Sequence, residues 1–207
     1  YLCSMKKLVI VGCGRLAGIV SDAVVNAGRL MKEGRAGAVK LEGGKLVCEQ
    51  IRAIVNASIP VVAHLGMTPQ SVNTLGGFKV QGKTADAARQ LLEDAKAVEE
   101  AGAFALVMEC VPAKLAALVT KTLHIPTIGI GAGAGCDGQV LVYQDMLGMF
   151  SDYRPKFVRK FAEVGKVMQE AFASYRSEIQ EGNFPTEEHS FAISDEVMAQ
   201  LEQEAQA

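Results

Sequence analysis

The chain has 207 residues, of which 49% are hydrophobic and 21% charged, a composition that suits one globular α/β domain with a sizeable core. Its formal net charge of −2 provides neither a basic field for nucleic acid nor a polycationic surface for a membrane, so we expect no partner of either class. The five cysteines form no CxxC pair, which argues against a zinc site and a disulfide framework and favours reduced thiols in a cytoplasmic protein.

Strand-like and helix-like patterns alternate along the chain. Strands are predicted at six places, around residues 8, 39, 62, 106, 128 and 141, the last covering 139–143. Helices are predicted over residues 17–33, 45–56, 84–100, 112–123, 155–181 and 194–205. We expect Thr84 to cap the third of these helices and Gly102 to follow its end.

This order of about six βα units predicts a parallel sheet with right-handed crossovers. A closed (β/α)8 barrel needs eight strands and typically about 250 residues, so the count alone leaves two architectures open. One is an open, doubly wound sheet, and the other is a TIM-type barrel that is short of two strands. No linker or repeat divides the chain, so a single domain is predicted over 1–207, with a polar C-terminal tail at 182–207.

Polar side chains follow the predicted strands at their carboxyl ends. The apolar run 104–112 carries Glu109 at its exit, and an ionised glutamate is almost never fully buried without a partner or a chemical role. The strand near residue 39 ends on Glu42, and the next strand carries His64 at a similar place. Parallel strands that each deliver a polar group to one edge of a sheet are typical of an α/β enzyme.

Other polar residues have plainer interpretations. Asp137 is expected to cap the turn after a glycine loop, His124 to mark a helix end, and His189 to be a packing element near the C-terminus. Cys110 is interpreted as a buried strand cysteine that acts as a small hydrophobe. For His64, a wall of the site or a metal neighbour and a satisfied structural histidine both stay open.

The glycines near the N-terminus resemble a dinucleotide-binding turn. Residues 7–17 contain GxGxxA after an apolar strand, and Gly12 and Gly14 would let backbone N–H groups approach a pyrophosphate. The acid expected about 20 residues further on would be Glu42, which comes roughly ten residues late. A tight strand–helix turn without a ligand is therefore favoured, and a nucleotide-binding oxidoreductase is kept as an alternative.

A set of longer stretches is far more specific than any single motif. These stretches lie at residues 26–32, 39–44, 62–73, 76–82, 108–112, 125–133, 137–142 and 187–191. In sequence, order and spacing they resemble the ketopantoate hydroxymethyltransferase family, also named 3-methyl-2-oxobutanoate hydroxymethyltransferase. The resemblance implies an incomplete (β/α)8 TIM barrel and a homo-oligomer in the cytoplasm.

The resemblance also implies a reaction and its site. A hydroxymethyl group would pass from 5,10-methylenetetrahydrofolate to 3-methyl-2-oxobutanoate, giving 2-dehydropantoate in pantothenate biosynthesis. Mg²⁺ would polarise the keto group as a Lewis acid. Glu42 matches the family's metal-site glutamate, Lys40 its substrate-carboxylate lysine, and Glu109 its proton acceptor. Side chains two residues apart on a strand point to the same face, so Lys40 and Glu42 would both face one pocket. The alternative is that the two residues only form an ion pair at the surface.

The chain departs from the family pattern at its beginning. The family's first two strands and most of its third, which supply two aspartates and a serine, are expected upstream of the matching stretches. Residues 1–20 look unlike the family and form an atypical N-terminal segment. We therefore expect an enzyme whose activity is impaired by missing metal ligands, and we keep a non-catalytic, self-associating remnant as the second hypothesis.

Overall fold

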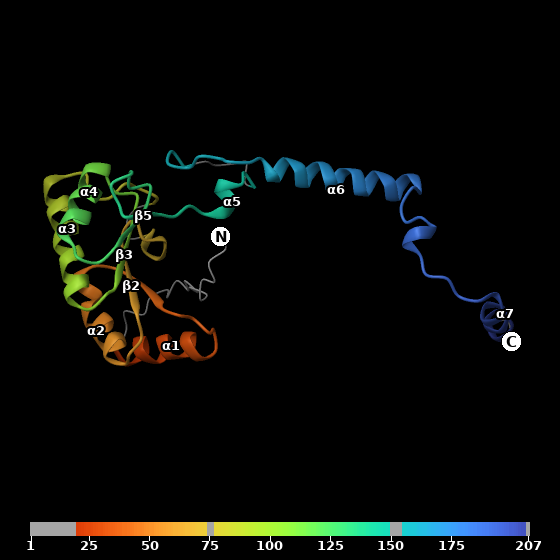
Figure 1. Ribbon diagram of the computed structural model, residues 1–207, viewed down its shortest axis with the longest axis horizontal. Helices are drawn as coiled ribbons and strands as arrows, with labels where there is room; N and C mark the ends of the chain where they lie inside the picture. Colours follow the sequence, from red (N-terminus) through yellow and green to blue (C-terminus); the bar gives the residue numbers. More distant parts are fainter. Residues whose placement is uncertain (1–19, 74–76, 150–154, 206–207) are drawn as a thin grey trace. The chain divides into compact units, whose positions relative to one another are not determined.

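The computed structural model describes residues 20–73, 77–149 and 155–205 (Figure 1). The chain forms two compact units, which are described separately below. The sheet unit comprises Tyr1–Val142 with Pro155–Val158, and the helical unit comprises Tyr143–Arg154 with Arg159–Ala207. The single domain predicted over 1–207, with its atypical segment 1–20 and its tail 182–207, stays a prediction.

The sheet unit is built on five parallel strands in consecutive order. The strands are β1 (Val39–Glu42), β2 (Val61–Gly66), β3 (Ala105–Glu109), β4 (Thr127–Ile130) and β5 (Gly138–Gln139). A doubly wound sheet reverses its strand order, whereas the sheet of a TIM barrel does not. The described strands therefore form part of a TIM-type barrel, as the resemblance implies. The strand predicted around residue 8 lies outside the described residues.

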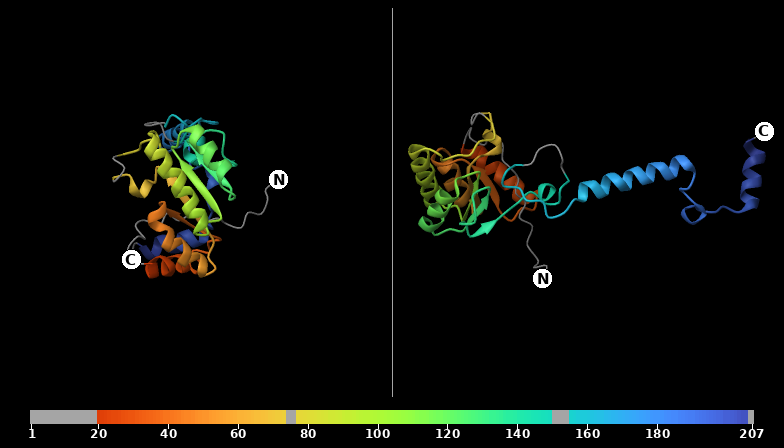
Figure 2. Two further views of the ribbon diagram at one scale, coloured as in Figure 1. Left: turned by 90° about the vertical axis from the view of Figure 1, so that its left-hand side faces the viewer. Right: turned by 90° about the horizontal axis from the view of Figure 1, so that it is seen from above.

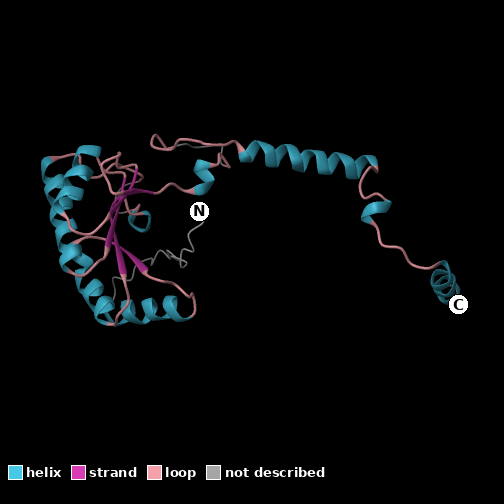
Figure 3. Cartoon of the chain, viewed as in Figure 1, coloured by secondary structure: helices cyan, strands magenta, loops and turns pink. Residues whose placement is uncertain are grey.

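The helices of this unit cover one face of the sheet (Figures 1 and 3), which the left view of Figure 2 shows from the helix side. They are α1 (Val20–Lys32), η1 (Lys45–Val47), α2 (Cys48–Asn56), α3 (Ala85–Glu100) and α4 (Ala113–Thr122). The short helix η2 (Pro69–Ser71) is not part of this layer and lies beside Glu42. Helix α3 begins where the sequence predicts, because the Thr84 side chain accepts a hydrogen bond of 3.2 Å from the Ala87 N–H. It ends at Glu100, and Ala101 and Gly102 follow, the latter with a positive φ of 100°.

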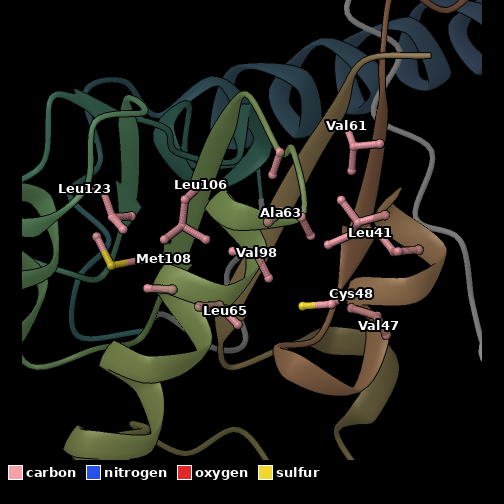
Figure 4. Packing of buried hydrophobic residues seen from close by; sticks show 14 of the residues in the cluster. Leu41, Val47, Cys48, Val61, Ala63, Leu65, Val98, Leu106, Met108 and Leu123 are labelled. Carbon is pink, nitrogen blue, oxygen red and sulfur yellow. The ribbon is translucent and has the colours of Figure 1, made fainter. Parts of the chain in front are cut away.

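Alternate residues of each strand form the core between the sheet and the helices. Figure 4 shows Leu41, Leu65, Leu106 and Met108 packed against Val98 of α3 and other buried residues. The remaining strand residues point to the opposite face, because successive side chains alternate. That second face carries a small apolar cluster and the polar residues Lys40, Glu42, His64 and Glu109.

The last predicted strand is wrong in its extent. The ladder stops soon after β5, with the Val140 N–H donating to the Gly129 carbonyl at 3.0 Å, and helix α5 (Tyr143–Met146) begins where the strand was expected to end. Val140 and Val142 alternate as strand residues do, yet they are 45% and 46% exposed. Among the described strands β5 is at the edge of the sheet, so the chain leaves the ladder without an outer partner to hold it.

Helix α6 (Val164–Glu181) begins nine residues later than Pro155, the predicted start. Residues 155–158 belong to the sheet unit instead, where Phe157 packs against Gly131 and joins the apolar cluster of the second face. Val158 is likewise buried at 5% exposure. A proline followed by good helix formers predicts a helix start, and the non-local contacts of Phe157 override that local preference.

The helical unit contains three α-helices and one short 3-10 helix among its described residues. They are α5, α6, η3 (Glu187–His189) and α7 (Asp195–Ala205). Helix α6 ends at Glu181, and Gly182 follows with a φ of 74°, the left-handed conformation that favours glycine after a helix. No helix within the described parts of either unit is long and apolar enough to cross a membrane.

Candidate functional site

Neighbouring strands bring the polar residues of the second face together. Glu42 of β1 lies opposite His64 of β2, and Gly66 lies opposite Glu109 at the end of β3. Lys40 precedes Glu42 by two residues and therefore points to the same side. We call Lys40, Glu42, His64 and Glu109 the polar cluster.

His64 is at the centre of the polar cluster. Its Nδ1 lies 3.2 Å from the Lys40 ammonium nitrogen and 3.5 Å from Oε1 of Glu42. Its Nε2 lies 3.4 Å from Oε2 of Glu109. The imidazole is buried at 1% exposure, while the side chains of Glu42 and Glu109 are 7% and 15% exposed. The two carboxylates thus approach the two opposite nitrogens of one buried ring.

The charges of the polar cluster alter its proton affinities. Burial disfavours the charged imidazole, but the neighbouring Glu109 and Glu42 carboxylates outweigh it and raise the pKa of His64 above 6.5. Burial also disfavours the charged form of Glu42, whereas hydrogen bonding to His64 and the Gln70 N–H, with the nearby Lys40 charge, lowers its pKa below 4.5. We infer that the cluster favours a charged Glu42 despite its burial.

The backbone after β2 holds the carboxylate of Glu42. Pro69 begins the short helix η2, and its turn aims the Gln70 N–H at Oε2 of Glu42 at 3.1 Å. Oε1 of the same carboxylate lies 3.7 Å from the Lys40 ammonium nitrogen. Sequence reasoning missed Gln70, although a proline at the start of a helical turn is a signal that could have indicated η2.

The backbone around Glu109 is fixed from both sides. The Met67 N–H donates to the Glu109 carbonyl at 2.8 Å, and the Cys110 N–H donates to the Ile130 carbonyl at 2.9 Å. Gly66 has a φ of 92° and lies against the Glu109 carbonyl so closely that a side chain there would clash. These contacts fix where β3 delivers the Glu109 side chain.

Cys110 does not match its interpretation as a buried strand residue. It follows the end of β3, is partly exposed, and has a φ of 51°, a conformation uncommon for a residue with a side chain. The positive φ turns the chain sharply just after Glu109. Burial and the Glu109 charge raise the pKa of the Cys110 thiol, which disfavours its thiolate.

Asp137 lies at the other end of the strands. Its Oδ2 accepts hydrogen bonds from the Thr127 N–H at 2.8 Å and from the Thr127 hydroxyl at 3.0 Å. Thr127 begins β4, whereas Glu109 pairs with Ile130 at the end of that strand. These hydrogen bonds lower the pKa of Asp137 and confirm its interpretation as a residue that holds the turn.

The two remaining histidines also lie outside the polar cluster. His124 follows α4, is 95% exposed in its side chain, and donates its backbone N–H to Oε1 of Glu99 at 2.6 Å, which confirms a helix-end residue. His189 belongs to η3 of the helical unit, where its ring packs 4.9 Å from that of Phe184. This contact agrees with the predicted packing role. Gly12 and Gly14 lie outside the described residues, so nucleotide binding stays a prediction.

Comparison with known proteins assigns the chain to a family. The family model for ketopantoate hydroxymethyltransferase matches residues 11–187, which include the whole polar cluster. The chain belongs to this family. The match begins inside the segment 1–20 that looks atypical in sequence.

Curated ketopantoate hydroxymethyltransferase relatives agree with the family match. The chain is 69% identical over 182 residues to the 3-methyl-2-oxobutanoate hydroxymethyltransferase of Clostridium novyi (strain NT), and 65% identical over 182 residues to that of Enterococcus faecalis (strain ATCC 700802 / V583). Each alignment covers 88% of this chain and 66% of the relative. The chain thus spans just under two thirds of the length of these relatives.

The resemblance to ketopantoate hydroxymethyltransferase implies Mg²⁺, so the described residues can be compared with what that ion needs. Mg²⁺ prefers six hard oxygen ligands, some of them water. Within the described ranges no group of three or more His, Cys, Asp or Glu side chains is arranged to hold a metal ion. Glu42 offers one carboxylate, with the Lys40 ammonium beside it. The described residues alone therefore do not form a magnesium site.

Proposed function

We propose that this chain transfers a hydroxymethyl group from 5,10-methylenetetrahydrofolate to 3-methyl-2-oxobutanoate, giving 2-dehydropantoate in pantothenate biosynthesis. The observation that carries the proposal is the polar cluster, in which a lysine and a glutamate of β1 and a glutamate of β3 surround one histidine of β2, the strand between them. The cluster lies inside the family match, and the named activity of the relatives requires groups that bind a 2-oxo acid and remove its proton.

Three of the four residues of the polar cluster, namely Lys40, Glu42 and Glu109, have a proposed task. The Lys40 ammonium would pair with the carboxylate of the keto acid. Glu109 would accept the proton from the carbon next to the keto group, and the electron pair left on that carbon would form the new bond to the one-carbon unit. The bonds from that unit to the two folate nitrogens would break, water would supply the hydroxyl oxygen, and tetrahydrofolate would leave. A base must lie within hydrogen-bond reach of the proton it removes, and Glu109 at 15% exposure still faces accessible space.

Magnesium is part of the proposal only through Glu42. When bound, Mg²⁺ would supply Lewis-acid polarisation of the keto oxygen, and Glu42 would contribute one carboxylate oxygen to it. The other ligands would be water and the substrate's oxygens. The Gln70 N–H and the Lys40 ammonium hold the Glu42 carboxylate in its position in this structure.

We also propose the partners of the chain and its location. Its partners would be the small keto acid, the folate cosubstrate and further copies of the chain in a homo-oligomer, and its location would be the cytoplasm. A non-catalytic remnant that only associates with itself is the competing hypothesis. The two differ in whether the polar cluster performs any chemistry.

A direct assay separates these hypotheses. The purified chain is incubated with the keto acid, methylenetetrahydrofolate and a range of Mg²⁺ concentrations, and 2-dehydropantoate is followed by mass spectrometry. We expect product from the wild type, a loss of at least about 100-fold for Glu109→Gln, and no loss for Glu93→Gln, a surface carboxylate on α3. Absence of product at every Mg²⁺ concentration would favour the remnant, and product that survives Glu109→Gln would remove Glu109 from the mechanism.

A further inference from the structure

We infer that His64 is the positioning residue for Glu109, and that it holds Oε2 of that carboxylate through its Nε2–H while the other oxygen faces the substrate. The inference rests on the proposed function, because it assigns a task to the one member of the polar cluster that has none there. It concerns the orientation of a base and not a proton transfer by His64 itself.

Lys40 decides which ring nitrogen carries the proton. An ammonium group can only donate hydrogen bonds, and its nitrogen lies 3.2 Å from Nδ1 of His64, closer than the Glu42 oxygen at 3.5 Å. A hydrogen bond donated by Lys40 to Nδ1 requires the lone pair of that nitrogen. The proton of the neutral ring must therefore be on Nε2. In the charged ring both nitrogens carry protons. Nε2 is therefore a donor in either state, and it faces Glu109.

The contact between His64 and Glu109 is close but not yet a good hydrogen bond. Nε2 is buried and has no well-aligned partner among the described residues, although Oε2 of Glu109 is only 3.4 Å away. An N–H···O bond usually spans about 2.7–3.2 Å, and a buried donor without a partner is unfavourable. Hydrogen bonds of catalytic groups are often long without substrate and shorten when it binds. We expect this contact to shorten in the same way.

The ring of His64 is well placed to orient its neighbour. It belongs to β2, which is paired on both sides, by β1 and by β3, and its side chain is 1% exposed. A buried side chain on a strand paired on both sides has little freedom to move. It can therefore restrict the rotation of Glu109 at the end of the next strand, which is the kind of positioning that a general base needs.

Kinetics of two variants test the role. His64→Met keeps the size of the side chain and removes the donor, whereas His64→Gln keeps an N–H group at a similar distance from the backbone. We expect His64→Met to lower kcat about 100-fold with the KM of the keto acid within about threefold, and His64→Gln to recover at least about tenfold of the loss. Equal losses in the two folded variants, or a change confined to KM, would overturn the inference.

A second measurement needs no turnover. The chain has three histidines, so the ¹⁵N signals of His64 can be identified by their loss in His64→Gln. At a pH above the pKa of its ring we expect the Nε2–H tautomer, and we expect Lys40→Met to shift the ring toward Nδ1–H while Lys45→Met, a change of an exposed lysine, does not. A wild-type ring with its proton on Nδ1 would overturn the inference.

The two measurements separate the inference from the proposed function. If no variant and no wild-type sample forms product, the proposed function fails, and the tautomer still decides whether His64 presents a donor to Glu109. If the wild type forms product and folded His64→Met keeps its kcat, the function stands and the positioning role is wrong.

Discussion

Glu42 and His64 lie directly opposite each other on adjacent parallel strands, and Oε1 of Glu42 is 3.5 Å from Nδ1 of His64. Both side chains are almost fully buried, at 7% and 1% exposure. Burying ionisable groups costs free energy that their mutual attraction often does not recover, and apolar residues of similar volume would usually stabilise a fold at least as well. We therefore interpret the pair as a functional feature of the sheet.

The pair predicts a pH dependence of stability. The pKa of His64 is raised above 6.5, so its contribution is complete below about pH 6.5 and is lost as the pH rises through the folded-state pKa. The pKa of Glu42 is lowered below 4.5, so its contribution is present above about pH 4.5 and is lost as the pH falls through its folded-state value. The two contributions together are largest between these limits.

Urea unfolding over a series of pH values checks this expectation. His64→Gln should remove the decrease in stability of the wild type above about pH 6.5, whereas His124→Gln, at an exposed position, should retain it. Identical pH profiles for the wild type and His64→Gln would show that the pair does not link protonation to folding.

A substitution in the core on the helix side should destabilise the fold. Leu106 is fully buried between the sheet and the helices, so Leu106→Ala removes apolar contacts and leaves a cavity (Figure 4). We expect a loss of about 3–4 kcal/mol in the free energy of unfolding. Leu46→Ala, at a position 93% exposed, should change it by less than about 0.5 kcal/mol. A small effect at Leu106 would contradict the packing described for β3.

Replacement of Lys40 should weaken the binding of the keto acid. A charge-assisted hydrogen bond contributes about 1.5–3 kcal/mol, so Lys40→Met should raise the KM of the keto acid about 10- to 100-fold. The KM of the folate cosubstrate should change much less, and Lys45→Met serves as the control. Steady-state kinetics with each substrate varied in turn measures both values. An unchanged keto acid KM would show that Lys40 only pairs with Glu42 and His64.

Asp137 should matter for the fold and not for the chemistry. Asp137→Ala removes the acceptor of two Thr127 hydrogen bonds at the beginning of β4, so the melting temperature should fall. The kcat of the folded fraction should stay within about twofold of the wild type, because Ile130, not Thr127, pairs with Glu109. A large loss of kcat at unchanged stability would instead place Asp137 in the reaction.

Local sequence patterns predicted much of this structure. The apolar runs of β1 to β4 identified these strands, and the polar residue at or near the carboxyl ends of β1, β2 and β3 identified three members of the polar cluster. The Thr84 cap predicted the start of α3. Each of these signals comes from residues that are close in sequence, because strand alternation and helix capping involve only sequence neighbours.

The missed features depend on contacts between distant residues. The role of His64 was left open because only the strand register places it between Glu42 and Glu109. The start of α6 was wrong because Phe157 packs beside Gly131, and the strand after Gly138 was too long because the edge of the sheet has no outer partner among the described strands. The local spacing of apolar and polar residues does not reveal such contacts between residues that are distant in sequence.

The central claim is that Glu109 removes a proton from the carbon next to the keto group. The most direct measurement is deuterium exchange into 3-methyl-2-oxobutanoate in D₂O with Mg²⁺ and without folate, followed by proton NMR. We predict exchange with the wild-type chain and a rate at least about 100-fold lower with Glu109→Gln. Exchange that is equally fast with Glu109→Gln, or absent with the wild type, would contradict the claim.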